Sequence, residues 1–298
     1  MRTICWLGVA MALTLSGAAA WAEDPIGRIS LGGSAGFSSF ALADVNDRIL
    51  NEGNHFLKEE HMPRLRTLDD IDFGWTFWGD LKIPVPFLDA FFLSGGYGFS
   101  TGKTESPDMD NKIEVEVRQE AYHVRLLYTP PFRFHEDVRL FVGGGPLIVT
   151  SQELTATQTN RSVAEEEWSE KIVYEGSGIG WQVCLAGEYM LQDHMTLAID
   201  LAYRSAAFDY ENWSARESVS LRLPPSAEEA EYERLHLEDS YIGRAFLDWE
   251  ATLAKGINDD DVPIYGPHYE QLTPLTPDEL GIDLTGFQIH IGLRFYFL

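Results

Sequence analysis

Apolar and polar residues alternate along much of the chain with a period of two. The clearest example is GFQIHIGLRFYFL at residues 286–298, in which every second residue from Phe287 to Phe297 is apolar. Because successive side chains of a strand point to opposite faces, this pattern predicts a β-strand with one apolar face. Seven earlier segments alternate in the same way, at residues 26–40, 71–85, 90–100, 113–128, 138–150, 178–191 and 195–204. We therefore expect eight strands.

The fourth of these segments changes phase along its length. Its apolar residues lie at even positions from Tyr122 to Tyr128, but at odd positions from Ile113 to Val117, where they alternate with glutamates. This change indicates a strand that leaves the membrane and exchanges lipid for water on its outer face. A β-bulge would explain the change of phase equally well.

The breaks between the segments alternate between short and long. The short ones are PVPFLD, TPPFRFHED and LQDH, and the longest break runs from about 205 to about 284. Short turns at one end and long loops at the other are typical of outer-membrane barrels, whose long loops lie outside the cell. Backbone groups that face lipid must all be paired, so such strands close on themselves. The fold expected is all-β: an eight-stranded antiparallel transmembrane β-barrel, an up-and-down meander.

The N-terminus has the features of a secretory signal peptide. Arg2 is followed by an apolar run, and small residues end at Ala22, so we expect residues 1–22 to be cleaved. That run is too short to span a bilayer, and no later stretch is long enough. Residues 23–298 are then a single barrel domain in the outer membrane of a Gram-negative bacterium. Its one cysteine, Cys184, excludes an internal disulfide.

The formal net charge of −25 argues against nucleic acid as a partner. Most of the acidic excess lies in the predicted loops, at about 41–70, 101–112, 151–172 and 205–284. We interpret these loops as a solvated surface that faces an anionic outer leaflet bridged by divalent cations. The segment NDDD at 258–261 lacks the glycine and terminal glutamate of a calcium-binding loop, which favours a solvated turn.

Two of the long loops contain helix signals. Asp44 is a candidate N-cap for VNDRIL. In the last loop Ser226 and Glu229 form a capping box, and Lys255-Gly256 is a stop signal. Apolar residues recur between them at helical spacing, at Leu235, Ile242, Phe246, Trp249 and Leu253. We expect a helix of several turns outside the membrane, with an apolar stripe that needs a partner.

The inward faces of the predicted strands carry charged residues and histidines. These are Arg28, Asp72, Asp80, Lys82, His123, Arg125, Arg139, Glu188, Asp200, Arg204, His290 and Arg294. Eight strands leave an interior about wide enough for side chains to fill, and buried charges must be paired. The residues therefore predict a plug of salt bridges. A charged gate or narrow ion path is the alternative.

Large aromatic residues on the outward faces predict girdles at the two membrane interfaces. They are Trp75, Phe77, Trp181, Tyr189, Tyr203, Phe295 and Phe297. A sugar-stacking role for some of them stays open.

The whole pattern resembles the small eight-stranded outer-membrane barrels, a group that includes the outer-membrane protein A barrel domain, the outer-membrane protein W family and the surface-antigen barrels. The final GLRFYFL is similar to the C-terminal signal that the barrel assembly machinery reads, although Leu298 here follows the aromatic Phe297. The resemblance implies assembly by that machinery. It carries over no catalytic residues, because these barrels share an architecture and not a site.

The sequence therefore predicts a non-enzymatic barrel without a cofactor or a metal. Its partners would be outer-membrane lipids and lipopolysaccharide. Its large acidic loops would bind an extracellular or envelope protein or support envelope integrity. A narrow pore for small or amphiphilic solutes is the first alternative. A lipid-modifying enzyme is the second, although no serine lies in a nucleophile motif and the histidines are scattered.

Overall fold

The fold is taken from a computed structural model of the chain. It describes residues 28–48, 54, 68–88, 90–107, 111–131, 135–163, 166–208, 214–222, 246, 275–276, 280, 282–283 and 285–297. Within these residues there is no helix long and apolar enough to cross a membrane. The predicted signal peptide and the predicted helix after Ser226, apart from Phe246, lie outside the described residues.

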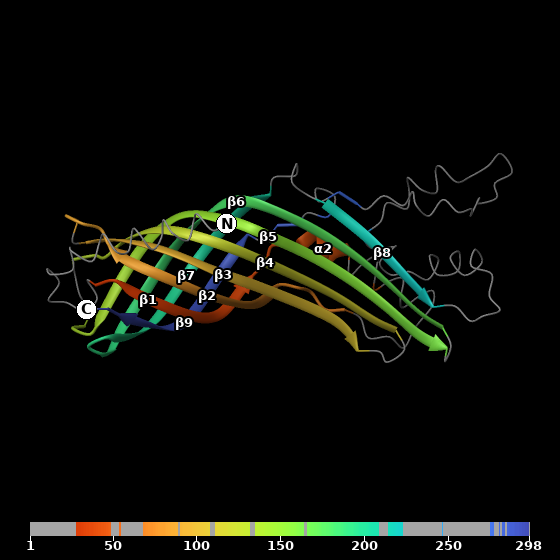
Figure 1. The fold of residues 1–298 in the computed structure, drawn as a ribbon, viewed down its shortest axis with the longest axis horizontal. Helices are drawn as coiled ribbons and strands as arrows, with labels where there is room; N and C mark the ends of the chain where they lie inside the picture. The colour runs from red at the N-terminus through yellow and green to blue at the C-terminus, as the bar shows by residue number, and fades with distance from the viewer. Residues whose placement is uncertain are drawn as a thin grey trace.

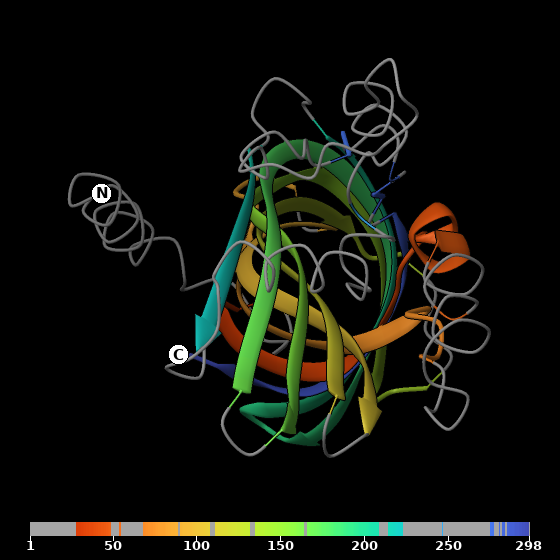
Figure 2. The same cartoon turned by 90° about the vertical axis from the view of Figure 1, so that its right-hand side faces the viewer.

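Eight antiparallel strands form a closed ring, which confirms the predicted barrel (Figures 1 and 2). Neighbours in the sequence are neighbours in the ring, and the first and last strands pair to close it, with Ser30 opposite Tyr296. The strands are β1 (Ser30–Ser39), β2 (Phe73–Pro84), β3 (Phe91–Pro107), β4 (Asn111–Tyr128), β5 (Val138–Val163), β6 (Glu166–Gln192), β7 (Met195–Phe208) and β9 (Gly286–Tyr296).

A ninth strand, β8 (Ser214–Arg222), lies outside the ring and was not predicted. It pairs with residues 167–175 of β6, beyond the point at which β7 stops pairing with that strand. The strands β3 to β6 are also long, and together with β8 they extend to the right of the barrel in Figure 1. The barrel thus continues beyond the ring as a five-stranded sheet on the long-loop side.

The change of phase predicted within β4 is a change in residue type, and the direction in which alternate side chains point stays the same along the strand. Odd positions of β4 are buried along its length, whereas even positions face outward. In the ring the outward residues are apolar, as at Tyr122, and in the extension they are charged, as at Glu114. The bulge lies in the neighbouring strand, where β5 has an extra residue at Thr150 opposite the Glu120–Ala121 step. The strand β4 therefore leaves lipid for water as expected, and the shift of phase at this level lies in β5.

The outward face of the ring is a band of exposed apolar side chains, as a lipid-facing surface requires. The predicted girdle residues Trp75, Phe77, Trp181, Tyr189, Phe295 and Phe297 are between 41% and 56% exposed. Tyr203 is half-buried because its ring packs between those of Trp181 and Phe287, with centroids 5.8 and 5.0 Å away. Phe37 and Trp75, 4.5 Å apart, continue this aromatic row around the barrel.

A hydrophobic core fills the concave face of the extension, and it is called the extracellular core below. It combines strand residues with residues of the first and last loops: Phe40, Leu42, Val45, Leu68, Ile71, Ile113, Val115, Val117, Leu154, Ala156, Ile172, Tyr174, Phe246, Leu275, Leu280 and Ile282. The side chain of Tyr174 donates a 3.0 Å hydrogen bond to the carbonyl of Phe246. The predicted apolar stripe thus has a partner at Phe246, its described residue.

The first long loop contains a short helix, α2 (Ala43–Asp47), visible beside the ring in Figure 2. Leu42 holds the N-cap position without a side-chain cap, so the prediction that Asp44 is the N-cap is wrong; Asp44 lies in the first turn. The helix buries Val45 in the extracellular core, and Asn46 accepts a 3.0 Å hydrogen bond from the backbone N–H of Ile71. Burial of this apolar face holds the helix in place, because five residues are too few for a stable isolated helix.

Candidate functional site

The lumen of the ring is the candidate site, and its centre is a layer of ion pairs. Arg294 on β9 lies 2.6 and 2.9 Å from the two carboxylate oxygens of Asp80 on β2. Its Nε also lies 3.0 Å from Oε1 of Glu188 on β6. Ser94 donates a 3.0 Å hydrogen bond to Asp80. Three strands that are not neighbours in the ring are thereby joined, and two of them, β2 and β6, lie on opposite sides of it.

Lys82 forms the next part of this layer toward the short-turn end. Its Nζ donates to both carboxylate oxygens of Glu188, at 2.8 and 2.9 Å, and to the hydroxyl of Tyr296 at 3.1 Å. The same ammonium lies 4.0 Å from the ring centroid of Phe141, a cation–π contact. Tyr296 in turn donates to Glu188. The side chain of Lys82 is fully buried, and each of these contacts is therefore shielded from solvent.

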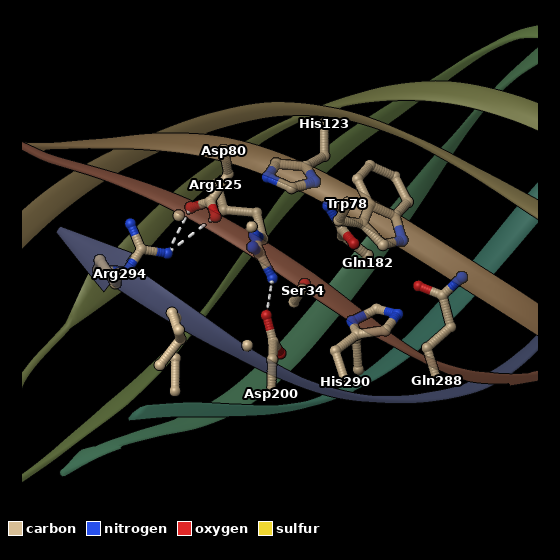
Figure 3. A pocket seen from close by; sticks show the side chains of 16 residues that line it. Ser34, Trp78, Asp80, His123, Arg125, Gln182, Asp200, Gln288, His290 and Arg294 are labelled. Carbon is tan, nitrogen blue, oxygen red and sulfur yellow. Dashed lines mark hydrogen bonds and ion pairs between the residues drawn. The ribbon is translucent and has the colours of Figure 1, made fainter. Parts of the chain in front are cut away.

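A small cavity lies in the middle of the lumen, and Figure 3 shows its lining. Its volume of about 30 Å³ holds on the order of two water molecules. Arg125 and Asp200 form an ion pair at 2.5 Å on its wall. The indole of Trp78 lies 4.8 Å from the imidazole of His123, between ring centroids. His290 also lines the cavity, and its register partner on the neighbouring strand β7 is Asp200.

Glycines on the inward faces make room for these large side chains. A Cβ atom on Gly32 would lie 2.9 Å from Oδ1 of Asp80 and 3.1 Å from the guanidinium carbon of Arg294. On Gly96 it would lie 2.8 Å from both Asp80 and His123. These distances are shorter than ordinary contacts, so the small residues on β1 and β3 are what allow the ion-pair layer to cross the lumen.

Arg204 lies toward the long-loop end of the lumen and is 1% exposed. It donates to the side-chain oxygen of Gln119 and, at 3.3 Å, to the hydroxyl of Ser100. Its guanidinium carbon lies 5.4 Å from the ring centroid of Phe40, which belongs to the extracellular core. The upper end of the lumen is therefore covered by the apolar residues of that core.

The sequence matches the family model of the outer membrane protein beta-barrel domain over residues 8–222. This match covers most of the chain and agrees with the closed ring of strands. The protein belongs to the outer-membrane β-barrel family. No curated protein matches its sequence at a significant level.

Several solved bacterial structures resemble this outer-membrane barrel. A major outer membrane protein from Thermus thermophilus shares 11% identity, with 91% of this chain and 98% of that chain covered and a TM-score of 0.40. CarO from Acinetobacter baumannii shares 12% identity over 76% and 93% of the two chains, with a TM-score of 0.30. OprG from Pseudomonas aeruginosa shares 11% identity over 90% and 94%, with a TM-score of 0.32.

Nine of the predicted lumen residues lie within the barrel of this outer-membrane protein: Asp80, Lys82, His123, Arg125, Glu188, Asp200, Arg204, His290 and Arg294. Arg139 is half-buried at the short-turn end of β5, opposite Glu188 in the register. Arg28 is half-buried just before β1, and among the described residues no ion pair joins it to the lumen network. Its assignment to the network is therefore not supported.

Asp72 does not face the lumen, so its prediction as a network member is wrong. It precedes β2, is exposed, and accepts a 3.2 Å hydrogen bond from the side chain of Asn46 on α2. The alternation that places Asp80 and Lys82 inward was extended too far toward the N-terminus. The strand begins at Phe73, and in the loop before it an odd or even residue number does not indicate which way a side chain points.

The charge-based prediction missed the neutral members of the network. Trp78, Ser94, Gln119, Gln182, Gln288 and Tyr296 are all at inward positions and buried. The two-residue alternation that placed the charged residues on the inward face places these six residues there too, so they could have been found from the sequence. Cys184 is buried with Phe92, Leu127 and Phe141 in a cluster at the short-turn end.

Charges on the outer face of the extension form a separate group in water. Lys112 lies 2.8 Å from Glu114, and Lys103 bridges Glu114 at 3.1 Å and Glu105 at 3.0 Å. Hydrogen bonding from Lys112 is the largest influence on Glu114 and lowers the pKa of its carboxyl below the ordinary value. In the described part of the chain, no three histidine, cysteine or carboxylate side chains converge as metal ligands.

Proposed function

We propose that the protein is a closed, non-enzymatic outer-membrane barrel whose outer surface, and not its lumen, carries its function. The observation that supports this proposal is that the lumen is blocked at two levels. Arg294, Asp80, Glu188 and Lys82 join opposite walls of the lumen, and the extracellular core lies over its upper end at Phe40. Both layers would have to move before a solute passed.

The partners follow from the two faces of the molecule. The exposed apolar band contacts outer-membrane lipid, and the extension and acidic loops reach the layer of lipopolysaccharide and divalent cations. These loops would bind an extracellular or envelope protein or contribute to envelope integrity. The closing strand β9 would present the signal for the barrel assembly machinery after export through a cleaved signal peptide.

The absence of enzymatic activity in this proposal rests on the geometry of the lumen. Within the described residues neither Nε2 of His123 nor Nε2 of His290 has a hydrogen-bond partner. Neither is thus aligned with a serine nucleophile in the way that acyl transfer requires. Incubation with outer-leaflet lipid followed by mass spectrometry should show unchanged lipid. A modified product would contradict this part of the proposal.

Planar-bilayer recording on refolded protein tests the closed lumen. The wild-type barrel should give no steady single-channel steps. A variant that removes the central ion pair without leaving a lone charge, Asp80→Ala with Arg294→Ala, should give more openings than the wild type. Its control is Glu175→Ala with Arg216→Ala, an exposed pair on the extension. Steady conductance in the wild type would overturn the proposal.

A narrow pore for small or amphiphilic solutes is the second candidate function, and the cavity beside Trp78 favours it. The cavity already supplies polar groups at mid-lumen, so displacement of the layer at Arg294 would extend it toward the short-turn end. In that case the wild type should conduct, and Trp78→Ala should increase the conductance. The same bilayer recording separates the two candidates.

A further inference from the structure

The buried charges of the lumen do not balance. Its cations are Lys82, Arg125, Arg204 and Arg294, and its carboxylates are Asp80, Glu188 and Asp200. Three of the cations each lie within 3 Å of a carboxylate oxygen. Arg204 is the remaining cation, and no described carboxylate lies within ion-pair distance of it. One positive charge is therefore left over, and it lies at the upper end of the lumen.

Two other carboxylates are relevant to this imbalance. Asp283 acts on Arg204 electrostatically, but it forms no ion pair with it, and its Oδ1 accepts a 2.7 Å hydrogen bond from the backbone N–H of Thr285. Glu170 is buried, but it lies on the part of β6 that pairs with β8, beyond the end of β7. Neither neutralises Arg204 directly.

The groups around Arg204 have unused hydrogen-bond donors. Its Nε and its second terminal nitrogen have no partner, although the side chain is buried. Gln119, which accepts from Arg204, has an unpartnered Nε2. Gln152 is its register partner on β5, is fully buried, and has no partner at either amide atom. A buried donor of this kind destabilises the folded protein as long as it stays unsatisfied.

We propose that the upper lumen binds one monovalent inorganic anion of about the size of chloride, between Arg204, Gln119 and Gln152. We call this the anion site. One negative charge neutralises the lumen. The guanidinium of Arg204 is joined to Gln119 by a hydrogen bond, and Gln119 lies opposite Gln152 in the register, so β7, β4 and β5 each supply a buried donor to this level of the lumen. The unbonded amide of Gln152 turns its nitrogen toward the anion, because no existing hydrogen bond holds it in another orientation.

The surroundings restrict the site to a small ion. Phe40 lies over Arg204 on the outer side. On the inner side Ser100 accepts from Arg204 at 3.3 Å, and Gln288 donates to Ser100 at 3.4 Å. Gln288 also lines the central cavity, as Figure 3 shows. The anion site thus lies between one aromatic ring and a short polar chain that leads to that cavity. The burial of Arg204, Gln119 and Gln152 favours a small inorganic ion over a bulky organic one.

Unfolding of the full chain in detergent micelles tests the proposal. Wild-type protein is unfolded in urea in sodium chloride and in sodium gluconate of equal ionic strength. Above the dissociation constant, each tenfold increase in chloride should raise the folded-to-unfolded ratio about tenfold, because the ion binds only the folded barrel. Gluconate should give no such increase. Equal behaviour in the two salts would mean that water alone satisfies these groups, and it would overturn the proposal.

Two variants and one control locate the effect. Gln119→Glu supplies the missing carboxylate beside Arg204, so the chloride response should disappear while the protein in gluconate becomes as stable as the wild type in chloride. Arg204→Met should also abolish the response. Arg216→Gln, in the exposed pair with Glu175, should keep the full response. A full chloride response in Gln119→Glu would refute the site.

Crystals grown in sodium bromide give a reading that does not depend on stability. An anomalous peak should lie beside Arg204 in the wild type and be absent in Gln119→Glu. An empty site in wild-type crystals, in salt that saturates the unfolding response, would contradict the proposal even if chloride stabilised the protein.

Discussion

Trp78 on β2 packs directly over Gly98, its register partner on β3. A Cβ atom at Gly98 would lie 2.3 Å from an indole carbon of Trp78. The indole donates a 3.0 Å hydrogen bond to Thr76, which fixes its orientation. The lumen at this level is thus built from one large and one minimal side chain, and the fit leaves no space for a methyl group.

Gly98→Ala should therefore destabilise the barrel. The added methyl group would overlap the indole of Trp78, whose orientation is fixed by its hydrogen bond to Thr76. Overpacking of this kind costs about 1–3 kcal/mol. Urea unfolding in micelles, followed by tryptophan fluorescence, measures the change. Gly95→Ala is the matched control on the same strand, because its Cβ faces outward and the nearest atom lies 3.8 Å away. Equal stability of the two variants would contradict this account of the packing.

The central ion pair gives a second prediction. Asp80→Asn should lower the free energy of unfolding by about 3–5 kcal/mol, because it leaves the buried Arg294 with a weaker partner. Glu188 retains its contact with Arg294, which places the expected value at the lower end of that range. The measurement is the urea midpoint together with the slope of the transition.

Its control is Glu175→Gln on the extension, where the carboxylate is 46% exposed and pairs with Arg216. An exposed pair contributes little, so a change within about 0.5 kcal/mol is expected. If Asp80→Asn were as stable as this control, the layer at Arg294 would not hold the lumen closed.

The extracellular core should unfold separately from the ring. Ile172→Ala removes a fully buried side chain from this core and should cost about 2–5 kcal/mol locally. Limited proteolysis of the refolded protein should then cut the extension faster than in the wild type. The heat-induced gel shift, which reports the closed ring, should stay unchanged. Loss of the gel shift would show that the two parts unfold together.

The neighbouring Lys171→Ala is the control for that experiment. Lys171 is exposed on the opposite face of β6, so it contributes nothing to the extracellular core. Its cleavage rate should match that of the wild type. Faster cleavage of this variant would mean that the outer face of the extension also stabilises it.

The alternation of residue types was enough to predict the ring. A two-residue period assigns a face to every residue within a strand, and in β9 each residue from Phe287 to Tyr296 lies on the face expected. The same rule placed Asp80 and Lys82 in the lumen. The rule failed at Asp72 because the two-residue period does not show where a strand begins.

The extension was harder to predict because both of its faces change character. In the ring, apolar residues face outward, and above it Val115 and Ile172 face inward against loops that are distant in sequence. An alternating sequence shows that one face of a strand is apolar, but it does not show whether that face contacts lipid or a protein core. Strand β8 was missed for a different reason. Its sequence SARESVSLR has charged residues and little apolar alternation, and its position depends on pairing with β6.

The last prediction concerns acid and the outer face of the extension. The hydrogen bond from Lys112 holds the pKa of Glu114 below its ordinary value of 4.5. A carboxyl whose pKa is lowered on folding stabilises the fold above its ordinary pKa and loses that contribution as the pH falls through the folded value. A double-mutant cycle of Glu114→Gln and Lys112→Met should therefore show favourable coupling at neutral pH, of a few tenths to about 1 kcal/mol. The coupling should vanish once the pH is well below the folded pKa. A coupling that persisted or grew in acid would rule out the ionised pair as its source.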